Sequence, residues 1–237
     1  MLLQLGTQVF LARTLGPNEY GIFAIGVIVI SLSNFFSDIG LAYGLIQKKE
    51  INDSDVRFVF SWQVITGSLV SIAVFFTSHS VAEFFSEPLA ENVLRALAVV
   101  CLINALAAPS NNILKRRLDF KRIQISQLLG YVVGYVLIGV PLAILGFGVW
   151  SLVIAWIVQS AVLLIYLFAR VRHKLTPLVW YVDASNMLNY GGKVLGTNIV
   201  NWIIGNIDRV IVGRFFTTRE IGFYSTSYNL VQGPTSA

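Results

Sequence analysis

Residues 149–171 of the chain read VWSLVIAWIVQSAVLLIYLFARV, an apolar run in which Arg170 is the one charged side chain. A helix needs about 20 mostly apolar residues to cross a bilayer core of about 30 Å, and this run meets that length. In soluble proteins apolar residues recur in shorter, periodic runs, because a surface that faces water has to be polar. The run therefore predicts a transmembrane helix.

The rest of the chain has the same character. Hydrophobic residues make up 56% of the 237 residues and charged residues 12%, whereas soluble proteins carry about 25% charged residues. The mean hydropathy is +0.72. Five further apolar segments are long enough to span a bilayer: 20–46, 58–76, 93–114, 123–145 and 188–216. These segments predict an all-α, polytopic transmembrane helical bundle.

Both ends of the chain carry partial segments. Residues 1–15 are apolar but too short to span comfortably, and they lack the basic start and cleavage site of a secretory signal. Residues 221–237 begin another apolar segment and stop soon after Gln232-Gly233-Pro234. We therefore expect a bundle that is truncated at both ends. It would comprise a first lobe at 1–171 with a partial first helix, a cytoplasmic linker at 172–187, and the start of a second lobe at 188–237 with a seventh helix and a partial eighth.

Basic residues gather in alternate loops. Eleven of the seventeen Lys and Arg residues lie in three stretches, 48–57, 115–122 and 170–174. Basic loops stay on the cytoplasmic side of a membrane, so these three are predicted to lie inside and the acidic loop at 83–91 outside. The basic stretch at 115–122 is interpreted as a topology signal that contacts anionic lipids, not as a nucleic-acid site.

No segment contains a convincing active site. Asp53-Ser54-Asp55 resembles the metal clamp of some glycosyltransferases, but with Asn52 before it the stretch suits a helix N-cap and first turn better. His79 and His173 lie on opposite predicted sides of the membrane. Cys101 is the single cysteine and sits in an apolar run, as a small core residue does. We expect no catalytic residue, no metal site and no cofactor.

The segment 188–216 differs from the others because it has a polar face. On a wheel of about 100° per residue, seven polar or small residues fall within an arc of roughly 160°: Lys193, Thr197, Asn198, Asn201, Gly205, Asp208 and Arg209. Charges at membrane depth usually face a bundle interior or a water-filled cavity. The pattern predicts a hydrophilic lumen lined by Arg209, Lys193, Asn198, Asn201 and Asp208. Two alternatives stay open: Asp208 and Arg209 neutralise other buried partners, or Lys193 snorkels to the cytoplasmic interface.

Smaller features predict packing and interfacial roles. Gly130-x-x-x-Gly134 and Gly192-x-x-x-Gly196 are small-x-x-x-small patterns that allow helices to approach closely. Pro109 and Pro141 are expected to kink or end their helices. Asp38, another acid in an apolar segment, is expected near the inner surface in an interfacial or capping role.

The chain also contains an internal repeat with a constant offset of 201 residues. Four matched pairs define it: Arg13 and Arg214, Glu19 and Glu220, Gly21 and Gly222, and the aromatic pair Phe23 and Tyr224. Both stretches join one predicted helix to the next on the outer side, six helices apart, so the second lobe would run parallel to the first. Repeated bundles around a midplane site are a recurring transporter design. Together with the polar face, the repeat favours a two-lobe transporter.

A family resemblance is carried by five stretches that are distributed over nearly the whole chain. They are 13–23 (RTLGPNEYGIF), 37–50 (SDIGLAYGLIQKKE), 118–124 (LDFKRIQ), 145–152 (LGFGVWSL) and 206–213 (NIDRVIVG). In this order and combination they resemble the Wzx-type lipid-linked oligosaccharide flippases, the polysaccharide-exporter branch of the MATE-like (MOP) superfamily. The resemblance implies a MATE-like fold of two six-helix lobes. It also implies transfer of an undecaprenyl-diphosphate-linked oligosaccharide from the inner to the outer leaflet of a bacterial plasma membrane.

The resemblance further suggests roles for the polar face. Arg209 and Lys193 are expected to contact the diphosphate, although Lys193 departs from the family pattern. Asn198, Asn201 and Asp208 are expected to contact sugar or to act in gating. The expected partners are the lipid-linked oligosaccharide, membrane lipids and a polysaccharide polymerase, with no nucleic acid. No ATP-binding motif occurs, so the energy would come from an ion gradient or from consumption of the product outside.

Two other functions compete with this hypothesis. A drug/cation antiporter of the same fold would prefer acidic cavity groups, whereas the polar face here is net basic. A membrane-embedded glycosyltransferase would need clustered carboxylates at one interface and a folded aqueous loop, and the loop at 170–187 is short for that.

Overall fold

A computed structural model describes residues 2–38, 40–48, 50–171, 176–182 and 184–235. Within these ranges the chain folds into helices joined by short connections, as the sequence predicts. The helical elements are α1 (Leu2–Asp38), α2 (Leu41–Gln47), α3 (Asp53–Phe84), α4 (Leu89–Arg116), α5 (Phe120–Tyr131), η1 (Val132–Gly139), α6 (Val140–Ile144), α7 (Trp150–Arg170), α8 (Ala184–Phe215) and α9 (Thr218–Thr235).

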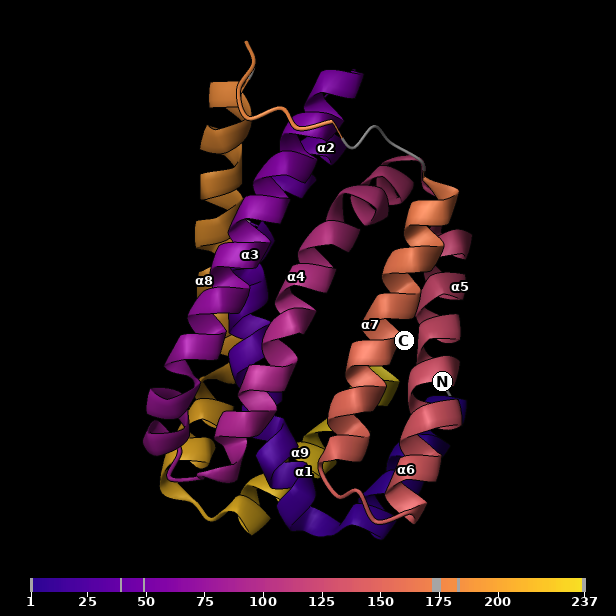
Figure 1. Cartoon of the computed structure of the whole chain (residues 1–237), viewed down its shortest axis with the longest axis vertical. Helices are drawn as coiled ribbons and strands as arrows, with labels where there is room; N and C mark the ends of the chain where they lie inside the picture. Colours follow the sequence, from indigo (N-terminus) through magenta and orange to yellow (C-terminus); the bar gives the residue numbers. More distant parts are fainter. Residues whose placement is uncertain (1, 39, 49, 172–175, 183, 236–237) are drawn as a thin grey trace.

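The long helices lie side by side and run alternately up and down (Figure 1). The α2–α3 and α4–α5 connections, which carry two of the basic stretches, lie at one end together with the C-terminal end of α7, and this end is here called the basic end. The α3–α4, α6–α7 and α8–α9 connections gather at the opposite end, here called the outer end because the basic loops predict that it faces outward. The alternation expected from the basic loops is therefore present in the fold.

Five helices are long and apolar enough to cross a membrane: Leu3–Ser37, Asp53–Phe84, Leu89–Arg116, Phe120–Ile144 and Trp150–Arg170. They account for the predicted apolar segments before residue 171, so the chain is a polytopic helical membrane protein. The helix predicted at 188–216 exists as α8 and begins four residues earlier, at Ala184. It is not among the five spans, because its polar face lowers its hydropathy, and its membrane crossing stays a prediction.

Two glycines interrupt the N-terminal helices. Gly16 has φ 80° and ψ 171° and is followed by Pro17, so α1 consists of two helices that meet at this kink. Gly40 has φ 67° and separates α1 from α2, so the segment predicted at 20–46 is not one helix. A side chain at Gly40 would also lie 2.5 Å from the carbonyl oxygen of Gly191. Glycine at this position therefore allows both the left-handed backbone conformation and the close approach of α8.

The predicted segment at 123–145 contains a π-helical stretch, η1, between α5 and α6. Pro141 follows within two residues of the end of η1 and cannot donate a backbone hydrogen bond to the preceding turn. A widened turn next to this proline accommodates the missing donor.

The two small-x-x-x-small patterns behave differently. A Cβ atom on Gly130 would lie 2.8 Å from the carbonyl oxygen of Gln159, and one on Gly134 would overlap the carbonyl oxygen of Ala155. The close approach predicted for Gly130 and Gly134 is therefore confirmed, with α7 as the partner helix. Among the described residues, no atom lies within 4 Å of such a Cβ on Gly192 or Gly196, so the prediction of close packing there is wrong for this part of the chain. These glycines lie on the side of α8 that faces away from its neighbours.

Three apolar clusters hold the bundle together, the smallest of which joins α1 to α6 and α7 and includes Leu11 and Leu152. Of the other two, one lies toward the outer end and includes Ile25, Leu97 and Val153, with Cys101 fully buried among them as predicted. The other lies toward the basic end and includes Phe58 and Leu114. Helices in lipid associate through close van der Waals packing, since burial from water no longer drives them together.

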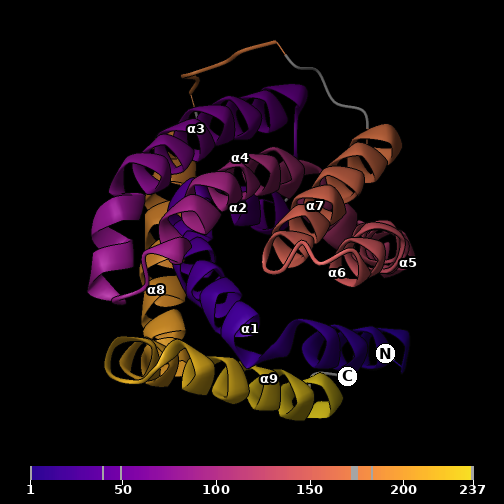
Figure 2. The same cartoon turned by 60° about the horizontal axis from the view of Figure 1, so that its bottom comes forward.

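The second half of α1 crosses α9 at the outer end, and Figure 2 shows the two helices next to each other. A Cβ atom on Gly21 would overlap the carbonyl oxygen of Thr218, and one on Gly222 would overlap the carbonyl oxygen of Pro17. Gly21 and Gly222 are equivalent in the internal repeat, and Pro17 and Thr218 are separated by the same offset. The contact is thus reciprocal, as in an interface related by a two-fold axis.

The repeated glutamates have different partners. Glu220 accepts a hydrogen bond of 2.9 Å from the backbone N–H of Thr217, and its own backbone N–H donates to the Thr217 hydroxyl over 3.4 Å, which forms a capping box at the start of α9. Glu19 instead accepts a hydrogen bond of 2.6 Å from the backbone N–H of Val149. It therefore ties α1 to the start of α7, 130 residues along the chain.

Candidate functional site: an amide-lined pocket

The acidic stretch that resembles a metal clamp has a structural role. The carboxylate of Asp55 accepts a hydrogen bond of 2.9 Å from the backbone N–H of Asn52, which completes a capping box at the start of α3. It also forms an ion pair of 2.8 Å with Lys48. Among the described residues, no group of three or more His, Cys, Asp or Glu side chains could hold a metal ion. His173 lies outside the described residues, as does the side chain of Asp38.

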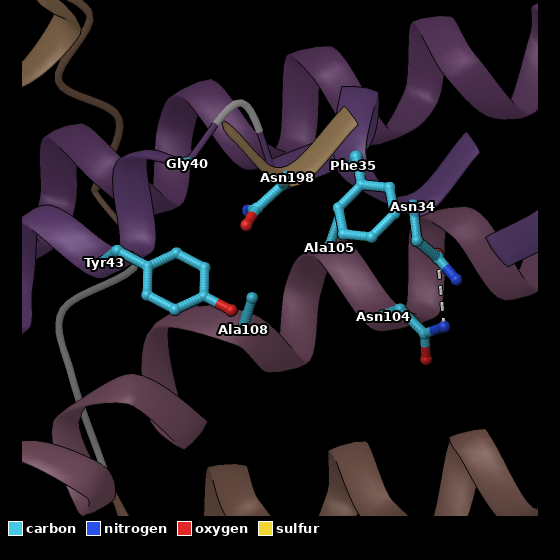
Figure 3. Close-up of a pocket in the computed structure, with 8 residues that line it drawn as sticks. All are labelled: Asn34, Phe35, Gly40, Tyr43, Asn104, Ala105, Ala108 and Asn198. Carbon is cyan, nitrogen blue, oxygen red and sulfur yellow. Dashed lines mark hydrogen bonds between the residues drawn. The ribbon is translucent and has the colours of Figure 1, made fainter. Parts of the chain in front are cut away.

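A cavity of about 250 Å³ lies where α1, α2, α4 and α8 meet (Figure 3). We call it the amide pocket, because three asparagine side chains line it. Its lining residues are Asn34, Phe35, Gly40, Tyr43, Asn104, Ala105, Ala108 and Asn198. Seven of them come from residues 34–108, and Asn198 comes from α8, so the pocket joins residues of both predicted lobes.

Hydrogen bonds between helices position two of the amides and the helix face that carries the third. The Nδ2 atom of Asn104 donates to Oδ1 of Asn34 over 3.2 Å and links α4 to α1. On α8, one turn after Asn198, the indole N–H of Trp202 donates to the hydroxyl oxygen of Ser31 over 2.9 Å. Residues four apart share a helix face, so this bond holds the Asn198 face of α8 against α1. Figure 3 shows the Asn34–Asn104 pair at one end of the pocket and Asn198 closer to Tyr43.

The lining determines which chemistry the pocket can offer. Each asparagine side chain has two N–H donors and a carbonyl oxygen that can accept two hydrogen bonds. Phe35 and Tyr43 add aromatic surface, and Ala105 and Ala108 leave room because their side chains are small. None of the eight lining residues carries a charge at neutral pH. The pocket therefore suits an uncharged ligand that both donates and accepts hydrogen bonds.

Two of the predicted lumen residues contact α9 instead. The hydroxyl group of Tyr224 donates a hydrogen bond to the carboxylate of Asp208. The guanidinium carbon of Arg209 lies 3.7 Å from the centroid of the Tyr228 ring. Both side chains therefore lie at the interface of α8 with α9, close to the outer end, and neither lines the amide pocket.

Lys193 and Asn201 are exposed on α8 and also lie outside the pocket lining. Of the five predicted lumen residues, only Asn198 lines the pocket, so the structure does not bring the five together in one cavity. The reason is geometric. Along its length α8 contacts α1, α2 and α9, so members of the polar arc of roughly 160° meet different helices or remain exposed.

The sequence analysis did not identify Asn34, Tyr43 or Asn104 as site residues. A signal for two of them was present, because Asn34 and Asn104 are amides inside apolar segments. An amide without a partner is costly in such a segment, so each one indicates either a hydrogen bond between helices or a polar cavity. Here the two amides provide both.

The fold and the pocket together define a multi-pass membrane protein with an uncharged polar pocket between its helices. Residues 10–237 match the family described as polysaccharide biosynthesis protein, and the chain belongs to this family. This match confirms the resemblance to the polysaccharide-exporter branch that the sequence motifs indicated.

Three relatives illustrate the family. The chain is 25% identical over 230 residues to the succinoglycan biosynthesis transport protein ExoT of Rhizobium meliloti. This alignment covers 96% of this chain and 46% of ExoT. The chain is 22% identical over 230 residues to the lipopolysaccharide biosynthesis protein WzxC of Escherichia coli. This alignment covers 94% of this chain and 46% of WzxC. The chain is 25% identical over 204 residues to the teichuronic acid biosynthesis protein TuaB of Bacillus subtilis. This alignment covers 83% of this chain and 41% of TuaB. The chain thus spans slightly less than half the length of these relatives, and no solved structure matches it.

Proposed function

We propose that the whole protein moves an undecaprenyl-diphosphate-linked oligosaccharide from the inner to the outer leaflet of a bacterial plasma membrane. The observation that carries this proposal is the amide pocket, which lies between α1, α2, α4 and α8 and whose described lining carries three amides and no charge. Lipid tails cannot form hydrogen bonds with three amides, and a cationic drug would need a carboxylate in the lining to balance its charge. Sugar hydroxyl groups, which donate and accept hydrogen bonds, are the ligands that suit such a lining.

The names of the relatives support the same substrate class. They refer to the biosynthesis of succinoglycan, lipopolysaccharide and teichuronic acid, and ExoT is named as a transport protein. We propose that this chain likewise serves polysaccharide or lipopolysaccharide biosynthesis by transport, without catalysing a step itself. The 1–171 stretch would form the first lobe, the 172–187 stretch the linker, and the 188–237 stretch the start of the second lobe. A polysaccharide polymerase would take over the product outside.

Arg209 is our candidate for diphosphate contact. A guanidinium group can bind two phosphate oxygens at once, and stacking on Tyr228 uses the face of the group, not the edge where its N–H donors point. Its Nε atom is buried and has no hydrogen-bond partner among the described residues. A bound diphosphate would supply that partner.

Lys193 would contact the diphosphate at a different stage. Sixteen residues of helix separate Lys193 from Arg209, about 24 Å along the axis, so one diphosphate cannot touch both. We propose that Lys193, nearer the basic end, meets the lipid as it enters. Asn201, exposed between the two cations, would contact sugar, and Asp208, held by Tyr224, would act in gating.

The proposal is tested in the native bacterium with the full-length gene. The gene is deleted and replaced by wild type, Arg209→Ala or Asn206→Ala, and lipid-linked sugar on the inner leaflet is quantified against polysaccharide at the surface. Asn206 is the matched control, since its amide donates to Trp202 within α8 and does not line the pocket.

Deletion should trap lipid-linked sugar inside, and Arg209→Ala should fail to restore surface polysaccharide at normal membrane levels, whereas Asn206→Ala should restore it. If neither quantity changes on deletion, the flippase proposal is wrong.

A further inference from the structure

We infer that the amide pocket is a subsite for a single uncharged sugar ring of the lipid-linked substrate, separate from the place that holds the diphosphate. The inference rests on the proposed transport function and specifies which part of the substrate this pocket selects. It depends on the size of the pocket, on the hydrogen-bonding capacity of its amides, and on the absence of charge among its lining residues.

The size of the pocket limits the ligand to one ring. The cavity measures about 250 Å³, whereas pockets that hold drug-sized ligands measure about 300–1,000 Å³. Phe35 and Tyr43 provide flat apolar surface for the C–H face of a ring, and no bulky side chain projects from Ala105 and Ala108 opposite them. An oligosaccharide would place one ring here and the others outside.

The amides keep unused hydrogen-bonding capacity. The bond between Asn104 and Asn34 uses one donor on Asn104 and one acceptor position on Asn34. Each of these side chains has two N–H donors and two acceptor positions, so each can form further hydrogen bonds with a ligand. Asn198 adds a third amide from α8. Such mixed donors and acceptors match ring hydroxyl groups and also an N-acetyl group.

The described lining residues of the pocket carry no charge, and this disfavours the acidic parts of the substrate. A carboxylate or phosphate in the pocket would lose its water without meeting a cation in the lining. The ammonium group of Lys115 lies nearby, 5.7 Å from the centroid of the Tyr43 ring, but Lys115 does not line the pocket. Arg209 lies eleven residues from Asn198, about 16 Å along α8, so the proposed diphosphate contact is a separate place.

The test measures binding to purified full-length protein in detergent with three probes: undecaprenyl diphosphate that carries one neutral hexose, the same lipid with glucuronic acid in its place, and bare undecaprenyl diphosphate. Wild type should bind the hexose lipid about tenfold more tightly than either of the others, the effect of one or two net hydrogen bonds. Asn198→Ala should remove this preference and leave the affinity for the bare lipid unchanged.

Two controls keep the result specific. Asn206→Ala should retain the full preference, because that amide is bonded within α8. Asn104→Ala, a second pocket variant on a different helix, should lose the preference as Asn198→Ala does, and size-exclusion profiles establish that each variant is folded.

The outcomes separate this inference from the proposed function. Equal binding of all three lipids, equal weakening of all three by Asn198→Ala, or tighter binding of the glucuronic acid lipid would overturn the sugar subsite while leaving transport intact. If none of the three lipids binds to wild type, the proposed function fails and the inference fails with it.

Discussion

Gly21 and Gly222 are 201 residues apart in the chain and make the same contact from opposite sides of one helix crossing. Gly21 lies against the backbone carbonyl of Thr218, and Gly222 lies against that of Pro17. At the same crossing the hydroxyl group of Thr218 donates a hydrogen bond to the carboxylate of Glu87 on the α3–α4 connection. The two copies of the repeat therefore pack against each other at the outer end through equivalent residues.

Replacing Gly21 by leucine should separate α1 from α9. The added Cβ atom would meet backbone, which no change of rotamer can relieve, so α9 has to move. The measurement is cross-linking by a short bismaleimide of protein carrying Glu87→Cys and Thr218→Cys, whose native side chains are hydrogen-bonded. The reagent bridges the gap that two cysteines, shorter than the native pair, leave open. We expect efficient cross-linking with Gly21 present and a loss of most of the cross-link with Gly21→Leu.

A second cysteine pair within the first lobe serves as the control for this experiment. The Nδ1 atom of His79 on α3 lies 3.0 Å from Oε2 of Glu91 on α4, so His79→Cys with Glu91→Cys should react with the same bismaleimide equally with and without Gly21→Leu. The buried native Cys101 should not compete. An unchanged yield of the 87–218 cross-link in the Gly21→Leu protein would contradict the tight crossing.

Removing the carboxylate of Glu19 should destabilise the start of α7. Its bond to the N–H of Val149 satisfies one of the donors that a helix leaves free at its N-terminus. We expect Glu19→Ala to lower the free energy of unfolding by about 1 kcal/mol, as loss of a helix cap does. Glu19→Gln keeps an acceptor oxygen and should cost less. Thermal unfolding in detergent measures both, and equal midpoints for wild type and Glu19→Ala would rule out the capping role.

The two small-x-x-x-small patterns should respond oppositely to alanine. Gly134→Ala overpacks the contact with Ala155 on α7 and should destabilise the bundle by about 1–3 kcal/mol. Gly196→Ala meets open space in a helix interior and should be neutral or stabilise by up to about 1 kcal/mol, since alanine favours helix more than glycine does. Thermal unfolding of both variants side by side provides the comparison. A larger loss for Gly196→Ala than for Gly134→Ala would contradict the packing described above.

The acidic stretch at the start of α3 should act through structure and not through metal. The side chain of Asp55 is 1% exposed and pairs with Lys48, which is 28% exposed. Asp55→Asn should therefore cost about 2–3 kcal/mol, somewhat less than breaking a fully buried pair, because Lys48 keeps part of its water. Glu50→Gln, an exposed carboxylate on the same connection, should change little.

A ligand that binds the folded state raises the unfolding midpoint, so a metal clamp at this stretch would be stabilised by its ion. Adding Mg²⁺ or Mn²⁺ should leave the midpoint of the wild type unchanged. A clear rise of the wild-type midpoint on adding metal, absent in Asp55→Asn, would contradict the structural role and support the glycosyltransferase alternative.

The helices and their alternation followed from the sequence, because the forces that decide them are local. In lipid every backbone N–H and C=O group must be satisfied internally, so an apolar run such as 149–171 has to be helical. The cap at Asn52 and Asp55 and the break at Gly16-Pro17 also depend on neighbouring residues alone. The motif stretches were sufficient to indicate the family.

Only the tertiary structure decided which polar and small residues meet. Asn34, Asn104 and Asn198 come from three helices and form one pocket, whereas Asp208 and Arg209, on the same polar face as Asn198, contact α9 instead. Gly134 and Gly196 belong to the same kind of pattern, yet only Gly134 touches another helix. A helical wheel, or the spacing of residues in a sequence pattern, describes one helix and the direction in which each side chain leaves it. The neighbour in that direction depends on how all the helices pack together, and that packing is set by contacts between residues far apart in the chain.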